Sequence, residues 1–333
     1  MSITPELVCP AGTPAALRDA VDAGADSVYC GLQNATNARN FPGLNFSLED
    51  LRESVAYAHA RRAKVLLAVN SFATAGKTSL WRDAIDAGVD LGVDAIIVAD
   101  IGVAAYAARA HPQQRLHLSV QASASSPEAI GYYCREFGIR RVVLPRILTI
   151  PEIEQIASEI PCEIETFIFG NHGLMLEGRC SLTNYITGQS TNMDGVCSPA
   201  SQVRFEPGPN GTMSSRLGEL VIDCFTQSDN AGYPTICKGR YLTPCREGPY
   251  YAFEEPVSLN LAAMLGDLIK AGVHAFKIEG RQRSRAYVKA VVSSFRRAID
   301  AALSGGAPDV DGLLALTEGQ KQTAGAFKTK TWR

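Results

Sequence analysis

Hydrophobic and polar positions follow two alternating patterns over the first half of the chain. Short runs rich in β-branched residues, typical of buried strands, are separated by segments of helical length that have one apolar face. The pattern predicts seven strands, at residues 6–9, 27–30, 64–69, 95–99, 115–120, 141–144 and 163–169. An alternation of strands and helices of this kind indicates a parallel sheet.

Residues between these strands carry the signals that start and end helices. Hydroxyl side chains that cap a helix, followed by a proline or an acidic residue within the first turn, predict four helix starts, at Thr13, Ser47, Ser126 and Thr149. Glycines stand where helices should end, at Gly24, Gly92 and Gly138.

The alternation stops at Gly170 and resumes at Ser258. There the pattern predicts a helix over 260–270, an eighth strand over 275–278 and a long helix over 284–303. Eight strand–helix units predict an α/β protein with a closed, TIM-like (β/α)8 barrel. An open doubly wound sheet is the alternative, but the glycine fingerprint that such sheets carry after an early strand is absent.

These boundaries divide the chain into four parts. Residues 1–170 hold the first seven barrel units, 171–250 form an insertion after strand seven, 251–305 hold the last unit and closing helix, and 306–333 form a small polar tail that we expect to be poorly packed. The insertion is rich in Gly, Pro, Ser and Asn and leaves the barrel on its catalytic face. We expect that apolar packing alone does not order it and that a metal centre supplies cross-links.

Composition narrows the possible functions. The chain has 333 residues, of which 46% are hydrophobic and 20% charged, as in ordinary globular proteins. Its formal charge of −2 gives no electrostatic reason to expect a nucleic acid or an anionic membrane as partner. No signal segment or membrane-spanning stretch is evident, so we expect a cytoplasmic protein.

Nine cysteines in such a chain fit reduced thiols or metal ligands better than disulfides. Five of them lie in the insertion: Cys180, Cys197, Cys224, Cys237 and Cys245. Cys180, Cys197 and Cys237 occur in loops with Gly and Pro, which suit an iron–sulfur cluster, although buried inert thiols fit nearly as well. His172 lies beside them, but a single histidine is more often a structural residue than a ligand.

Polar residues follow the predicted barrel strands where such barrels place their chemistry. They are Asn70, Asp100, Gln121, Arg146, Glu279 and Arg281. As a set they predict a site for a small anionic ligand, whereas each alone fits a loop cap. Lys277 and Glu279 alternate on the last strand and would face the same side, as a structural ion pair or as an acid–base couple.

Several motifs together resemble one family over nearly the whole chain. They are LVCPAG at 7–12, GADSVY at 24–29, TNARNF at 36–41, SVQAS at 119–123, VVLPR at 142–146, EGRC at 177–180, CSPA at 197–200, AGYPTICKGR at 231–240 and KIEGRQRS at 277–284. The chain resembles the collagenase-like peptidase family U32, in its ubiquinone-biosynthesis branch.

This resemblance implies a barrel protein that carries a [4Fe–4S] cluster on four cysteines. It implies a heterodimer with a UbiV-like family member, which hydroxylates the ring of a ubiquinone precursor without O2 and with prephenate as the oxygen source. Three family cysteines match Cys180, Cys197 and Cys237, but the fourth position, seven residues before Cys180, is Gly173. The alternatives are His172 as fourth ligand, a cluster with an open iron, Cys224 or Cys245 as a substitute, or no cluster.

The predicted site combines these observations. We expect Gln121, Lys277 and Glu279 to act in catalysis, and a substrate-binding anion site built by Asn37, Arg39, Arg146 and Arg281. The alternative for the arginines is pairing with carboxylates such as Asp100 and Glu279. Other functions to weigh are a peptidase, for which no nucleophile–base motif or zinc helix is present, hydroxylation of tRNA uridine, and a noncatalytic iron–sulfur subunit.

Overall fold

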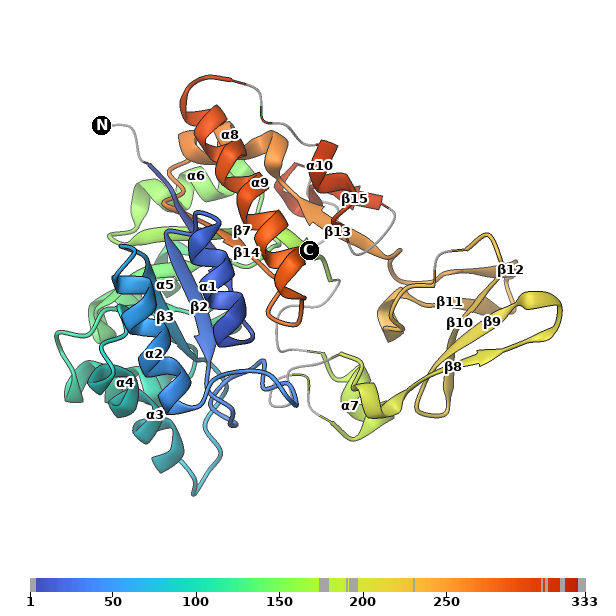
Figure 1. The fold of residues 1–333 in the computed structure, drawn as a ribbon, viewed down its shortest axis with the longest axis horizontal. Helices are drawn as coiled ribbons and strands as arrows, with labels where there is room; N and C mark the ends of the chain where they lie inside the picture. The colour runs from blue at the N-terminus through green and yellow to red at the C-terminus, as the bar shows by residue number, and fades with distance from the viewer. Residues whose placement is uncertain are drawn as a thin grey trace.

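The computed structural model describes residues 4–173, 180–189, 191, 197–229, 231–306, 308, 311–317 and 321–328. Within these ranges the chain forms a barrel, a smaller lobe from the insertion, and a short C-terminal segment that returns to the barrel (Figure 1).

Eight parallel strands close the barrel. They are β1 (Glu6–Pro10), β2 (Ser27–Gly31), β3 (Lys64–Val69), β4 (Ala95–Val98), β5 (Leu116–Leu118), β6 (Ile139–Val143), β7 (Glu163–Asn171) and β14 (Ala275–Ile278). Each strand pairs with the next along the chain, and β14 closes the ring by pairing in parallel with both β7 and β1. The predicted (β/α)8 fold is confirmed.

Helices cover the outside of the barrel. They are α1 (Pro14–Asp22), α2 (Leu48–His59), α3 (Ser79–Asp90), α4 (Ile101–Ala110), α5 (Pro127–Phe137), α6 (Ile150–Glu159), α8 (Leu265–Lys270) and α9 (Arg285–Leu303). All four predicted starts are confirmed, because the side chains of Thr13, Ser47, Ser126 and Thr149 each accept a backbone N–H from the first turn.

The eighth unit departs from the predicted boundaries. The helix expected over 260–270 begins only at Leu265, because strand β13 (Val257–Asn260) occupies its expected start. Strand β7 runs beyond the barrel to Asn171, and β13 pairs antiparallel with this extension. Asn260 ends the strand, where its side chain accepts the backbone N–H of Ala262. The apolar run was therefore a strand followed by a helix.

The insertion contains regular structure of its own. After α7 (Leu182–Thr187), strands β8 (Val203–Pro207), β9 (Met213–Leu217) and β10 (Leu220–Phe225) form an antiparallel sheet, and β11 (Arg240–Thr243) pairs with β12 (Arg246–Tyr251). Leu217, Ile222 and Ile236 form a separate buried apolar cluster in this lobe. The insertion therefore has regular structure and an apolar cluster of its own, while the expected metal cross-links stay a prediction.

The C-terminal segment packs better than its composition suggests. Helix α10 (Asp311–Leu314) precedes β15 (Lys321–Thr323), which extends the sheet by pairing in parallel with β13. The side chains of Leu313 and Phe327 are buried in the main core. The expected loose tail is thus wrong for the described residues. Among the helices that the structure describes, none is long and apolar enough to cross a membrane.

Candidate active site at the mouth of the barrel

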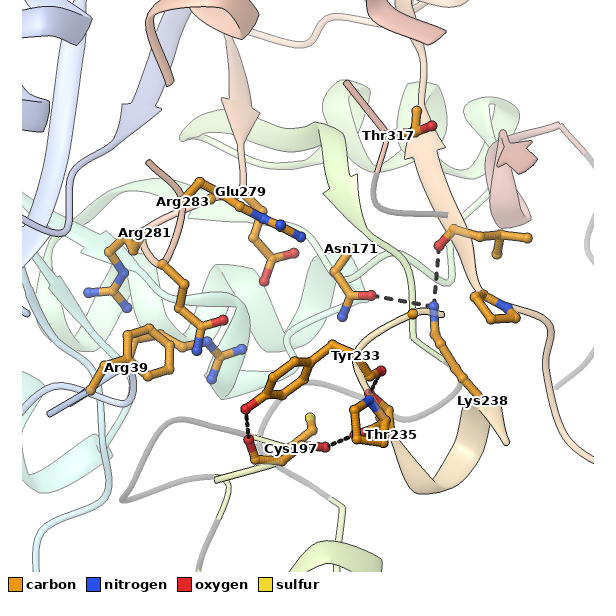
Figure 2. Close-up of a pocket in the computed structure, with 18 of the residues that line it drawn as sticks. Arg39, Asn171, Cys197, Tyr233, Thr235, Lys238, Glu279, Arg281, Arg283 and Thr317 are labelled. Carbon is orange, nitrogen blue, oxygen red and sulfur yellow. Dashed lines mark hydrogen bonds between the residues drawn. The ribbon is translucent and has the colours of Figure 1, made fainter. Parts of the chain in front are cut away.

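A cavity of about 1560 Å³ lies between the carboxyl ends of the barrel strands and the inserted lobe. Its floor consists of side chains that point into the barrel from successive strands, among them Tyr29, Ala68, Ile97, Val143, Phe167 and Lys277. Figure 2 shows Arg39, Glu279 and Arg281 on the barrel side, Cys197 and Tyr233 of the insertion across from them, and Lys238 hydrogen-bonded to Asn171. The barrel and the insertion therefore build the cavity together.

Arg146 follows β6 and pairs with Glu279, which follows β14, at 2.7 Å between Nη2 and Oε2. Its guanidinium carbon also lies 3.9 Å from the centre of the Phe167 ring. For Arg146, pairing with a barrel carboxylate is thus observed. Asp100 has another role, because its carboxylate caps α4 by accepting the backbone N–H groups of Gly102 and Val103.

Lys277 pairs with Glu165 instead of Glu279. Its Nζ lies 2.6 Å from Oε1 of Glu165, and both side chains are buried inside the barrel. Burial lowers the pKa of Lys277, and the charge of Glu165 opposes this effect. The predicted Lys277–Glu279 couple is therefore not formed, although both residues line the cavity.

Asn37 positions two arginines from behind the cavity wall. It is fully buried, and its Oδ1 accepts a hydrogen bond from Nη1 of Arg281 at 2.8 Å and from the backbone N–H of Arg39 at 3.0 Å. A Cβ at Gly31 would lie 2.3 Å from Nδ2 of Asn37, so this packing requires glycine there. Asn37 does not face the cavity as a substrate-binding residue would.

The partners of Arg39 and Arg281 are neutral in the part of the chain that the structure describes. Arg281 donates to the Asn37 amide, and Arg39 donates to the backbone carbonyl of Ala38. Burial lowers the pKa of Arg281 to about 10, which still leaves it charged at neutral pH. Both line the cavity, so two guanidinium groups face it without a described carboxylate at ion-pair distance.

Gln121 lies in the short 3₁₀ turn Val120–Ala122 that follows β5. It is buried and lines the cavity, and its backbone N–H donates to the side chain of Ser119. Six of the seven predicted catalytic and substrate-binding residues thus line this cavity: Gln121, Lys277, Glu279, Arg39, Arg146 and Arg281. Only Asn37 stands behind it.

The three matched cysteines lie within electrostatic reach of one another. Desolvation raises the pKa of Cys197, Arg39 opposes this effect, and the charge of Cys180 raises the pKa further. Burial, followed by the charge of Cys197, raises the pKa of Cys237 to about 11, with a further contribution from Cys180. In the described ranges, no three His, Cys, Asp or Glu side chains are placed to hold a single metal ion. A cluster binds each thiolate at a different iron, so its ligands are spaced more widely than those of one ion.

His172 follows the last residue of β7. Its Nε2 lies 3.8 Å from Oε1 of Glu254, and its buried Nδ1 has no hydrogen-bond partner in the described structure. Burial lowers the pKa of His172 to about 4, so the imidazole is neutral at neutral pH, which is the form that binds metals. The other cysteines considered, Cys224 on β10 and Cys245 between β11 and β12, are exposed.

Sequence analysis missed two residues that organise the site. Glu165 is the ion-pair partner of Lys277. The signal in the sequence was that Glu165 follows Glu163 by two residues, the spacing that places both side chains on one side of a strand. Lys238 donates to the carbonyl oxygens of His172 at 2.5 Å and Val257 at 3.2 Å (Figure 2 draws Lys238). It thereby ties the turn that carries Cys237 to the barrel mouth.

Comparison with known proteins identifies relatives whose names describe the hydroxylation of RNA. The chain is 32% identical to tRNA hydroxylation protein P1 of Bacillus subtilis over 89% of this chain and 63% of the relative. It is 31% identical to tRNA hydroxylation protein P of Escherichia coli over 95% and 72%. A 23S rRNA 5-hydroxycytidine synthase of Escherichia coli is 29% identical over 89% of this chain and 39% of the synthase's own length. The chain thus spans less than two thirds of the length of some of these relatives.

Among solved structures, a U32 peptidase superposes with a TM-score of 0.51 at 14% identity, over 85% of this chain and 96% of that one. At this identity the likeness concerns the fold alone. The sequence profile of peptidase family U32 matches residues 12–331. Because this match covers nearly the whole chain, it shows that the chain belongs to peptidase family U32.

Proposed function

We propose that this chain is an iron–sulfur component of an O2-independent ring hydroxylase of the UbiU type. Its substrate is a ubiquinone precursor, prephenate is the oxygen source, and a UbiV-like family member is its partner. The hydroxylation proteins among its relatives support the reaction class. The observation that carries the proposal is the pair of cavity arginines, Arg39 and Arg281, whose described partners are neutral.

These arginines suit a ligand with carboxylate groups. A guanidinium binds a carboxylate through two parallel hydrogen bonds, and a charged hydrogen bond contributes roughly 1.5 to 3 kcal/mol. Prephenate carries two carboxylates, which matches two guanidinium groups. Glu279 and Gln121 supply a carboxylate and an amide beside the bound anion, where they can accept or donate a proton or hydrogen bond.

Cys180, Cys197 and Cys237 are the residues that would hold the cluster. Their thiols influence one another electrostatically, and the neutral imidazole of His172 is a chemically suitable fourth ligand. An open iron is the alternative to His172. When bound, such a cluster supplies electron transfer or Lewis-acid chemistry. The protein's own part is to exclude water from the cavity and to orient the anion with its arginines.

RNA hydroxylation is the second candidate, because the names of the relatives favour it. A cavity floor lined by Tyr29 and Phe167 also fits a planar base. The formal charge of −2 argues against a large nucleic-acid footprint.

One experiment separates the two. Cells that lack the gene are grown without O2 and complemented with the wild-type protein, with Arg39→Lys or Arg281→Lys, or with Arg18→Lys as a surface control. Hydroxylated quinone intermediates and hydroxylated nucleosides are measured in the same cultures. The proposal expects quinone hydroxylation to return with the wild type and the control but not with the two site variants. Restoration of hydroxynucleosides alone would assign the protein to RNA.

A further inference from the structure

A primary amine lies at the floor of the cavity, beside an aromatic ring and a buried carboxylate. The Nζ of Lys277 is 3.9 Å from the centre of the Tyr29 ring, and 5% of the residue is exposed. Ile97, Val143 and Phe167 line the same floor. A ligand that reaches the bottom of the cavity therefore meets this amine after losing most of its water.

Several groups around Lys277 act on the balance between its ammonium form and its neutral, nucleophilic form. Burial lowers its pKa, and the nearby charges of Arg281 and Arg141 lower it further, while Glu165 opposes them. Desolvation and a neighbouring cation are two ways in which proteins activate lysine toward carbonyl groups. Glu165 Oε1 lies 2.6 Å from the Nζ, within reach to take its proton.

A carboxylate-binding group stands near this amine. The guanidinium carbon of Arg281 is 5.5 Å from the centre of the same Tyr29 ring that Lys277 contacts. In a 2-oxo acid the ketone is bonded directly to the carboxylate. Such a ligand can place its carboxylate on Arg281 and its ketone toward Lys277, with its remaining part in the wider cavity.

We propose that Lys277 forms an imine with the ketone of a 2-oxo acid bound in this cavity. Glu165 first takes a proton from the ammonium, and the nitrogen lone pair then attacks the carbonyl carbon to form the C–N bond. The two protons left on the nitrogen pass to the carbonyl oxygen as the C–O bond breaks and the C=N double bond forms, so water leaves, the first proton stays on Glu165, and no oxidant or reductant is required. The choice of a 2-oxo acid rests on the proposed function, because prephenate is itself a 2-oxo acid.

The test is reductive trapping, which does not require the hydroxylation reaction. Purified protein is mixed with phenylpyruvate and sodium borohydride, digested, and mapped by peptide mass spectrometry. We expect one reduced adduct on Lys277, whereas Lys238 and Lys321, which line the cavity wall, remain unlabelled. Phenyllactate, which has a hydroxyl in place of the ketone, is the control ligand and should give no adduct.

Two variants sharpen the result. Lys277→Arg keeps a cation beside Glu165 but cannot form an imine, so it should fold and lose the label. Glu165→Gln removes the carboxylate that raises the pKa of Lys277, so its amine should label at lower pH than in the wild-type protein. Wild-type protein without label, or with label only on other lysines, would overturn the proposal even if quinone hydroxylation were confirmed. Labelling of Lys277 together with absent quinone hydroxylation would instead leave the imine standing and refute the proposed function.

Discussion

The buried pair of Lys277 and Glu165 gives the sharpest prediction for stability. Removing one member of a buried ion pair costs about 3 to 5 kcal/mol, because the other charge is left without compensation. The two members are not equivalent here. Glu165 retains Arg141 at 3.3 Å if Lys277 is removed, whereas no other carboxylate is described at the Nζ of Lys277 if Glu165 is removed. Glu165→Gln should therefore destabilise the protein more than Lys277→Met.

The cost of Glu165→Gln has a ceiling set by proton release. A lysine with an ordinary pKa of 10.5 can be deprotonated at pH 7 for about 5 kcal/mol, at 1.36 kcal/mol per pH unit. We expect a loss of about 3 to 5 kcal/mol at pH 7. If Lys277 is neutral in the folded variant, the unfolded chain binds one more proton, and the free energy of unfolding rises with pH until about 10.5.

Urea unfolding followed by circular dichroism measures both effects. Glu163→Gln is the matched control, because Glu163 lies two residues earlier on β7 and is 34% exposed, and its buried partner Arg141 keeps Glu6 and Glu165. The double variant Glu165→Gln/Lys277→Met should cost less than the sum of the two single changes. The reasoning is refuted if Glu165→Gln destabilises no more than Glu163→Gln.

Three further predictions follow from the site and the barrel interior. Arg281→Lys should weaken phenylpyruvate binding by about tenfold to a hundredfold in calorimetry, because it loses a guanidinium fork that contributes roughly 1.5 to 3 kcal/mol. Arg146→Lys should weaken binding less, because Arg146 is already paired with Glu279. Burial holds the pKa of His117 well below 6.5, so the free energy of unfolding should fall as the pH drops below about 6.5, by up to about 1.4 kcal/mol per pH unit. His117→Gln should remove this pH dependence, whereas the surface change His59→Gln should not. Anaerobically purified protein should contain about four iron and four sulfide ions per chain. This content should be lost when any of the matched cysteines is changed to alanine. An unchanged iron content in His172→Ala would exclude the imidazole as a ligand. The alanine variants are Cys180→Ala, Cys197→Ala and Cys237→Ala.

The barrel could be predicted because its signals are local. Each strand is a short apolar run, and each helix start carries its own capping residue, such as Ser47, whose partner Asp50 lies three residues away. The pairing of charged side chains inside the barrel is not local. Alternation predicts Lys277 and Glu279 on one side of the last strand, but β14 ends at Ile278. In its register against β7, Lys277 lies opposite Phe167 and Ala275 opposite Glu165, so the side chain of Lys277 reaches Glu165 diagonally. Chain pattern alone does not give that register.

The insertion shows the same limit. Its hairpins pair residues such as Arg204 and Arg216, which are neighbours only through the antiparallel register of β8 and β9. Its apolar cluster is small and drawn from separate segments, so it has no periodic signal in the sequence. The Gly- and Pro-rich composition indicates many turns, and such turns also join the short strands of the insertion, which the sequence pattern did not predict.

The cavity and the cysteines form one electrostatic unit. Apart from desolvation, Arg39 lowers the pKa of Cys197 and Glu279 raises it, so charges on the barrel side act on a thiol of the insertion. Interaction between two sites is reciprocal: an anion that neutralises Arg39 disfavours negative charge at Cys197, and negative charge at Cys197 weakens binding of that anion to the same degree. Lys238 fixes this relation in space, because its hydrogen bonds to His172 and Val257 hold the insertion against the barrel mouth. Occupation of the proposed anion site and the charge on the cysteines should therefore not vary independently, because the insertion after strand seven lies where each can respond to the other.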